Sequence, residues 1–247
     1  MAPVLILRET DSTNLEARRR AEEGEFGPLW IAAKHQTAGR ARRGRGWDLD
    51  TGNLAQTLLL KLDKTPFEAS QLTFVAALAV YDLVARYVPP SLLSIKWPND
   101  VLLDGKKVSG ILLESGSAPE GGLWLAVGIG VNLQAAPTGT ERPATCVADH
   151  LGTSHIFAPT IEEAGQALAE IFDHWLVLWQ TQGFDGVRQA WVSRTPGLFG
   201  PCIARLPNET LEGTANGIEP DGSLRLKLAD GTVRIISAGD VFFGENG

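Results

Sequence analysis

The segment KWPNDVLLDGKKVSGILLES, residues 96–115, carries the strongest fold signal in the chain. Apolar runs flank Asp104-Gly105, a dipeptide that favours the tight turn of a β-hairpin. Pro98 restricts the residue before it to an extended conformation. We therefore expect a hairpin over 101–115, entered through a rigid Trp-Pro step.

Outward from this hairpin, segments of strand and helix character follow one another without a regular strand–helix–strand order. Such mixing favours an α+β domain built on a mixed β-sheet rather than a doubly wound parallel sheet. We expect strands over 29–33, 53–62, 92–96 and 123–133, and helices over 67–88 and 161–180. A further helix is expected to begin with Thr13 as its N-cap, to use Glu16 in a capping box, and to stop at Gly24.

The last fifty or so residues differ in pattern from the rest of the chain, with short apolar runs separated by turn residues. Thr195-Pro196-Gly197 reads as a boundary, and short strand-like runs follow at 202–206, 224–228 and 232–236. Turn signals separate them at 219–222 and 230–231. We therefore predict two domains, a larger one over 1–195 and a small β-barrel over 196–247.

Composition excludes several classes of protein. The 247 residues carry a formal net charge of −7, so the surface as a whole does not attract nucleic acid. Cys146 and Cys202 belong to no CxxC pattern, which argues against a disulfide framework or a thiolate zinc site and suits a reducing cytosol. No targeting segment is visible, and the apolar run 74–80 is far below membrane-spanning length. We expect a cytoplasmic protein without a membrane partner.

The most concentrated charge lies in residues 34–45, which contain five cations and no acid: Lys34, Arg40, Arg42, Arg43 and Arg45. Arginine makes planar, bidentate contacts with phosphate and carboxylate, and the interspersed glycines allow close approach to a ligand. An anion-binding loop and a solvated charge run that contacts nucleic acid are both compatible with this composition. A Walker A loop is excluded because no Gly-Lys-Ser/Thr follows.

Two further segments offer polar groups of interest. Asn99-Asp100 could hold Mg²⁺ or a phosphate-bound water through oxygen ligands. Lys107 either meets an anionic partner or is an ordinary surface lysine of a strand, and Lys106 is expected in the solvated turn. Asn132, in the segment GIGVN over 128–132, could read the edge of a purine or serve as a turn residue. The chain shows no GxSxG, HExxH or metal-type histidine spacing, so we expect no enzyme nucleophile.

Taken in order, these motifs resemble bacterial biotin–protein ligases over almost the whole chain. The resemblance rests on DSTN at 11–14, QTAGRARRGR at 36–45, KWPND at 96–100, KVSGIL at 107–112 and GIGVN at 128–132. The chain departs from the family at Ala41, where the arginine loop usually has glycine, and Gly46 stands before Trp47 where the family varies. Neither departure removes a charge.

The resemblance implies a class II synthetase-like ligase domain followed by an SH3-like barrel, and a two-step reaction. Biotin and ATP with Mg²⁺ would form biotinyl-5′-AMP and pyrophosphate, and a carrier lysine would then attack the mixed anhydride. Two anions meet in the first step, so a cationic site is the main catalytic requirement. The adenylate hydrolyses easily, which calls for a loop that closes over it.

The resemblance also assigns roles to residues. The catalytic cations would be Lys107, Arg40 and Arg42. The biotin site would comprise Ser12, Thr13, Asn14, Gln36, Gly39, Arg40, Arg42 and Lys107. The ATP and adenylate site would comprise Arg40, Arg42, Arg43, Trp47, Asn99, Asp100, Lys107 and Asn132. No metal ligand is assigned beyond Asp100 as a candidate, since Mg²⁺ would arrive with ATP.

The implied partner is a biotin carboxyl carrier protein or the carrier domain of a biotin-dependent carboxylase, and a homodimer is compatible with the family. Because the 11–14 motif lies so near the start, we expect a monofunctional ligase without a DNA-binding domain. Two alternatives stay open. One is a lipoate or octanoyl ligase or transferase of the same superfamily, and the other is an anion- or nucleic-acid-binding module.

Overall fold

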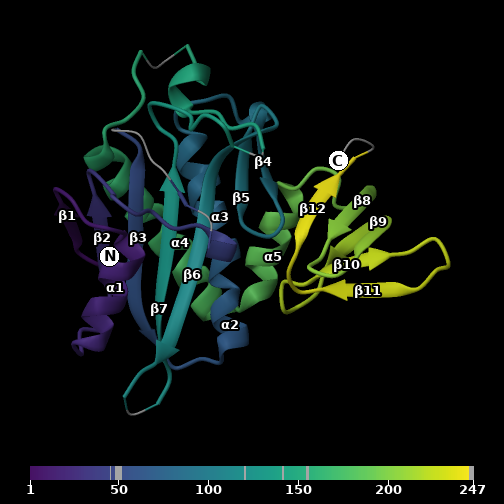
Figure 1. Ribbon diagram of the computed structural model, residues 1–247, viewed down its shortest axis with the longest axis horizontal. Helices are drawn as coiled ribbons and strands as arrows, with labels where there is room; N and C mark the ends of the chain where they lie inside the picture. The colour runs from purple at the N-terminus through teal and green to yellow at the C-terminus, as the bar shows by residue number, and fades with distance from the viewer. Residues whose placement is uncertain (45, 48–51, 120, 141, 154–155, 245–247) are drawn as a thin grey trace.

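A computed structural model describes residues 1–44, 46–47, 52–119, 121–140, 142–153 and 156–244 (Figure 1). Its larger sheet has seven strands in the order β1-β2-β3-β7-β6-β5-β4. The strands are β1 (Val4–Leu7), β2 (Leu29–Ala33), β3 (Leu54–Leu62), β4 (Leu93–Lys96), β5 (Asp100–Leu103), β6 (Lys106–Ser117) and β7 (Leu123–Val131). β1 and β2 run parallel and all other neighbours are antiparallel, which confirms the predicted mixed sheet.

The predicted hairpin is β5–β6. Its turn residues Asp104 and Gly105 have φ values of 52° and 71°, the left-handed conformation that a two-residue turn requires at both positions. β6 continues past its partner: β5 pairs only as far as Gly110, whereas β7 accompanies β6 to Ser117. The outer edge of β6 after Ile111 therefore has no strand of this sheet beside it.

The helices cover the two faces of this sheet unequally. Trp30 and Leu58 alternate along their strands with Ile31 and Leu59, so the two sets face opposite sides. The larger core lies under α3 (Leu72–Val84), α4 (Ile161–Gln182) and α5 (Phe184–Ser193), with the short α2 (Pro66–Ser70) beside it. Among the described helices, only α1 (Thr13–Glu22) packs on the other face, through Ala17 and Ala21. That sparsely covered face is where the cavity described below lies.

Three of the expected helix features need correction. Thr13 is the first helical residue rather than the N-cap; Ser12 occupies that position and its side chain makes no capping bond. The Thr13 hydroxyl instead bonds Gln36, so the expected capping box does not form. The expected helix over 67–88 divides at Gln71, whose side chain accepts from Trp179 and donates to the carbonyl of Pro220.

By length and composition alone, Pro66–Val84 is the one stretch of the described residues that could span a membrane. Of the window concerned, 67% is buried inside the fold. The alanines and leucines of α3 pack between the sheet and α4, which is the environment of a core helix. An apolar core helix passes the same length and composition test.

The C-terminal part forms a second, antiparallel sheet in the order β11-β10-β9-β8-β12. Its strands are β8 (Pro201–Arg205), β9 (Thr210–Ile218), β10 (Leu224–Lys227), β11 (Val233–Ile236) and β12 (Asp240–Phe243). Both predicted turns join strands as expected, but β9 and β12 were not predicted. The β9–β10 turn docks on the larger sheet, because the Trp97 indole donates to the carbonyl of Gly222 at 2.9 Å.

Candidate active site

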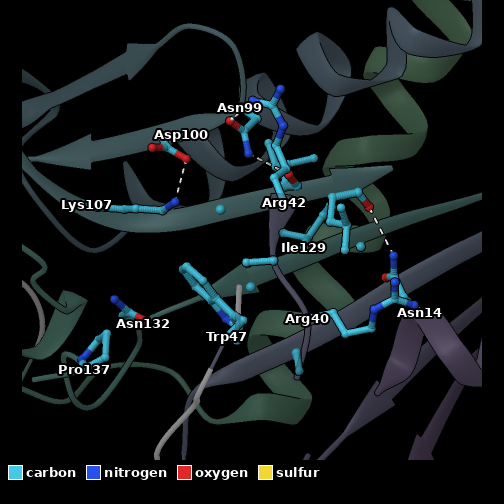
Figure 2. Close-up of a pocket in the computed structure, with 18 of the residues that line it drawn as sticks. Asn14, Arg40, Arg42, Trp47, Asn99, Asp100, Lys107, Ile129, Asn132 and Pro137 are labelled. Atoms are coloured by element: carbon cyan, nitrogen blue, oxygen red, sulfur yellow. Dashed lines mark hydrogen bonds and ion pairs between the residues drawn. The ribbon is translucent and has the colours of Figure 1, made fainter. Parts of the chain in front are cut away.

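A cavity of about 280 Å³ opens on the sparsely covered face of the larger sheet (Figure 2). It brings together eleven of the thirteen predicted site residues: Ser12, Thr13, Asn14, Gln36, Arg40, Arg42, Trp47, Asn99, Asp100, Lys107 and Asn132. Gly39 does not line it but closes the arginine loop, where its carbonyl accepts from Trp47 N at 2.9 Å. Arg43 lies in a 3₁₀ turn, Arg42–Gly44, and its side chain lies outside the described part of the structure, as does Arg45.

One end of the cavity is a network of uncharged polar groups. The Thr13 amide donates to Gln36 Oε1 at 2.8 Å, and the Thr57 hydroxyl donates to Asn14 Oδ1 at 2.7 Å. Thr57 is fully buried in β3, and sequence patterning did not single it out. These bonds orient hydroxyl and amide groups that can both donate and accept. Such an end suits a neutral polar ring.

The start of α1 is held from outside the cavity. Arg19 donates to both carboxylate oxygens of Asp11 at 2.9 Å, and Asp11 in turn accepts from the Ser12 amide at 2.7 Å. The hydrogen bonds from Arg19 keep the pKa of Asp11 well below its usual range. A permanently ionised Asp11 therefore fixes the backbone that presents Ser12 and Thr13.

The floor of the cavity is made of strand glycines that leave room for other side chains. A Cβ on Gly128 would collide with the Asn14 amide, and one on Gly130 would collide with the Trp47 indole. A Cβ on Gly110 would press on both Trp47 and Lys107. The two glycines of the GIGVN segment therefore allow close packing within the protein, and they do not form a phosphate-binding loop.

Among the described residues, two buried polar atoms at the other end have no hydrogen-bond partner. They are Trp47 Nε1 and Asn132 Oδ1; the Nδ2 atom of Asn132 donates to the Thr145 carbonyl at 3.0 Å. Both side chains face the cavity (Figure 2). Unpaired buried donors and acceptors are rare because they cost free energy, so a donor and an acceptor here indicate a ligand that offers the complements.

Charged groups lie between the two ends. Lys107 Nζ lies 2.7 Å from Asp100 Oδ1 and 5.1 Å from the centre of the Trp47 ring. Lys107 is therefore an interior residue of the cavity, and the reading of it as a surface lysine is wrong. Lys106, next to it, is exposed as expected.

The two arginines of the loop that line the cavity have different partners. Arg42 donates to Asn99 Oδ1 at 3.0 Å, and Asn99 Nδ2 donates to the Ile111 carbonyl at 2.8 Å. Arg40 Nη1 lies 3.1 Å from Glu114 Oε1. Figure 2 shows Arg42 beside Asn99, and Arg40 beside Asn14. Asn99 is thus engaged as a support for Arg42, which leaves Asp100 as the better oxygen ligand of the pair.

Sequence reasoning missed two charged residues of the cavity. Arg142 lies 3.9 Å from Asp100 and 3.7 Å from Asp240, and Asp240 belongs to β12 of the second sheet. In the described part of the chain, no three His, Cys, Asp or Glu residues gather as they would to hold a metal ion. No local signal marks Asp240, because only the docking of the two sheets brings it to the cavity.

A half-buried lysine, Lys96, lies behind this group. Burial lowers the pKa of Lys96 to about 8, and the positive charge of Arg142 acts in the same direction. Its ammonium group lies 4.6 Å from the centre of the Phe242 ring, on which Arg142 and Arg205 also stack at 4.5 Å. Positive charge is therefore concentrated where β12 meets the larger sheet.

The chain belongs to the biotin/lipoate A/B protein ligase family, whose model matches residues 7–133. A second model, the biotin protein ligase C-terminal domain, matches residues 197–244. A biotin–[acetyl-CoA-carboxylase] ligase of Paracoccus denitrificans is 44% identical over 97% of this chain and 100% of its own length. The bifunctional ligase/repressor BirA of Bacillus subtilis is 32% identical over 94% of this chain and 71% of its own length.

Solved structures agree on the fold. Biotin protein ligase from Aquifex aeolicus, in complex with biotin and ATP, superposes with a TM-score of 0.79 and covers 98% of this chain and 99% of its own. It is 23% identical in sequence. A biotin protein ligase from Leishmania major in complex with biotinyl-5-AMP superposes with a TM-score of 0.64 over 96% of this chain.

Proposed function

We propose that this protein attaches biotin to a lysine of a biotin carrier, at the cost of ATP and through a biotinyl-5′-AMP intermediate. The observation that carries the proposal is the cavity itself. A neutral hydrogen-bonding end around Thr13 and a second end around Trp47 and Asn132 share one cavity, and the cations Lys107, Arg40 and Arg42 also line it. A ligase of the same family that is 44% identical over nearly the full chain supports the choice of biotin as substrate.

The neutral end suits the ureido ring of biotin, which offers two N–H donors and one carbonyl acceptor. Gln36, Thr13 and Ser12 present both kinds of partner, and Gly128 lets the chain of Asn14 lie flat on the sheet. The carboxylate of biotin then points toward Arg40, Arg42 and Lys107. Gly39 contributes by keeping the loop closed at Trp47.

The end around Trp47 and Asn132, together with the adjacent cations, suits ATP. The unpartnered Asn132 Oδ1 accepts from the amino group of adenine, and Trp47 packs against the base. Lys107, Arg40 and Arg42 face the phosphates, and Arg43 is assigned to the same site by its place in the arginine loop. Asp100 and Asp240 offer the carboxylate oxygens that Mg²⁺ prefers, and a Mg²⁺ ion there would neutralise polyphosphate charge.

In the first step a carboxylate oxygen of biotin attacks the α-phosphorus and pyrophosphate leaves. Lys107 lies between the two ends, so it stabilises the charge that develops as the two anions meet. In the second step the amine of the carrier lysine attacks the acyl carbon and AMP leaves. Neither step requires a covalent bond to the enzyme, which agrees with the lack of a nucleophile motif.

Further parts of the proposal concern architecture. The larger domain extends over 1–195 and the smaller over 196–247. We assign the smaller domain to the SH3-like barrel architecture and the protein to the cytoplasm.

The unpaired outer edge of β6 beyond Ile111 is suited to an isologous strand contact in a homodimer. The partner is a biotin carboxyl carrier protein or a carboxylase carrier domain. We do not expect nucleic-acid binding, because Lys34, Arg40 and Arg42 contact Glu162, Glu114 and Asn99 within the protein.

The test is exchange of labelled pyrophosphate into ATP, run with biotin and with lipoate, followed by transfer to a purified carrier domain on a streptavidin blot. We expect exchange that depends on biotin and labelling of one carrier lysine. Lipoate-dependent exchange would support the lipoate ligase alternative. Salt-sensitive binding of DNA or RNA without either activity would support the nucleic-acid-binding alternative.

A further inference from the structure

Glu114 is a charged residue of β6 that contacts both the neutral end of the ligand-binding cavity and the arginine loop, without lining the cavity itself. It lies on the same face of β6 as Gly110, about 13 Å further along the strand, given a rise of about 3.3 Å per residue. Gly110 belongs to the cavity floor. Glu114 therefore stands beyond the cavity wall, on the cavity side of the sheet.

The two oxygens of its carboxylate have different partners. Oε1 lies 3.1 Å from Arg40 Nη1, and Oε2 accepts from Asn14 Nδ2 at 2.9 Å. Arg40 belongs to the arginine loop and Asn14 to the start of α1. One carboxylate thus connects the loop that carries the cations to the segment that forms the neutral end.

The contact with Glu114 helps to fix the side-chain position of each partner. Asn14 is almost fully buried, its Nδ2 also lies 3.3 Å from the Leu112 carbonyl, and its Oδ1 accepts from Thr57. The amide therefore presents one orientation, which Glu114 helps to set. Arg40 is 40% exposed, so its position depends on the ion pair far more than on packing.

We propose that Glu114 is a positioning residue that holds Arg40 at a fixed separation from the Asn14 end, and thereby matches the cavity to the length of the acid it activates. The inference rests on the proposed function. Biotin carries a ring at one end and a carboxylate at the other, joined by a flexible chain. A rigid connection between the groups that bind the two ends selects one chain length.

The direct test compares wild type with Glu114→Gln, which keeps the shape of the side chain and removes its charge. The control is Glu209→Gln, since Glu209 forms an exposed ion pair with Arg234 in the second sheet and does not line the cavity. For each protein, pyrophosphate exchange gives kcat and KM with biotin and with analogues whose side chain is one methylene longer or shorter.

We expect Glu114→Gln to raise KM for biotin about 3- to 10-fold, the effect of one or two hydrogen bonds, with kcat within about twofold of wild type. The preference for biotin over the longer and shorter analogues should fall by a similar factor. Glu209→Gln should leave all these values unchanged. Glu114→Asp keeps the charge but is too short to reach both partners, so it should shift KM in the same direction; it also serves if Glu114→Gln does not fold.

Three results would overturn the proposal. One is an unchanged KM and unchanged chain-length preference in folded Glu114 variants. Another is a lower KM for biotin, which would mean that Glu114 competes with substrate for Arg40. The last is a lower melting temperature and kcat with KM and preference unmoved, the signature of a purely structural role. Absence of biotin-dependent exchange in wild type and Glu209→Gln would instead refute the proposed function.

Discussion

Lys107 Nζ lies 2.7 Å from Oδ1 of Asp100, across the β5–β6 hairpin. This ion pair sets the position of the lysine from the first residue of β5, where the KWPND segment ends. Because the pair is largely enclosed, an incoming phosphate or carboxylate meets a lysine whose side chain is already directed into the cavity. The β5–β6 hairpin therefore positions Lys107 in the cavity through its ion pair with Asp100.

Lys107→Ala should reduce biotin-dependent pyrophosphate exchange about 10²- to 10³-fold, since removing one preorganised donor to developing charge has an effect of that size. The control is Lys106→Ala, because Lys106 is adjacent in sequence yet exposed at the start of β6. Circular dichroism checks that both variants fold. Near wild-type exchange in a folded Lys107→Ala protein would refute the catalytic role.

Asp100→Asn should raise the Mg²⁺ concentration needed for half-maximal exchange about tenfold or more, because a neutral amide is a weaker ligand for a hard cation than a carboxylate. Because the asparagine amide oxygen can still accept from Lys107, KM for biotin should change less than the Mg²⁺ requirement. The measurement is a Mg²⁺ titration of exchange at saturating biotin. Asp104→Asn, in the turn where asparagine tolerates the left-handed conformation, is the matched control. An unchanged Mg²⁺ dependence would exclude Asp100 as a metal ligand.

Substitutions of the two floor glycines, Gly128 and Gly130, should affect the KM values of different substrates. Gly128→Ala displaces Asn14 and should raise KM for biotin, whereas Gly130→Ala displaces Trp47 and should raise KM for ATP. We expect about tenfold in each case, since overpacking by one methyl group costs about 1–3 kcal/mol. Gly152→Ala, which meets only an ordinary contact with the Tyr87 carbonyl, is the control. Equal effects of both variants on both substrates would contradict the assignment of the two ends.

Trp97→Phe should destabilise the protein by about 1–3 kcal/mol, because it leaves the Gly222 carbonyl without its donor at the junction of the two sheets. For a chain of this size the melting temperature should fall by about 2–4 °C per kcal/mol. Trp124→Phe, on β7 against α1, is the comparison. A melting temperature equal to that of wild type would show that this bond does not help to hold the sheets together.

Lys96 should make stability depend on pH in the alkaline range. Its pKa is lowered to about 8 by burial, whereas an unfolded lysine titrates near about 10.4. Between these values the unfolded chain binds more protons, so the free energy of unfolding contributed by Lys96 rises with pH. Lys96→Met should therefore stabilise the protein at pH 7, and the gain should shrink toward pH 10. Urea unfolding at several pH values measures this, and a gain that stays constant would contradict it.

Local sequence determined the elements and most of the chemistry of this protein. Asp104-Gly105 specified the β5–β6 turn because few dipeptides adopt left-handed φ at both positions, and strand periodicity marked β2 and β3 closely. The concentrated positive charge of the arginine loop predicted an anion-binding site. In contrast, Thr13 was misplaced as an N-cap because its hydroxyl bonds Gln36, a partner distant in sequence.

Contacts between distant segments were decided by tertiary structure alone. No local pattern indicates that Thr57 orients Asn14, that Glu114 connects Asn14 to Arg40, or that Asp240 from the second sheet reaches the cavity. Each of these residues is ordinary in its own strand. Its role arises from strand order and from the docking of one sheet on the other, which bring together side chains that sequence spacing keeps far apart.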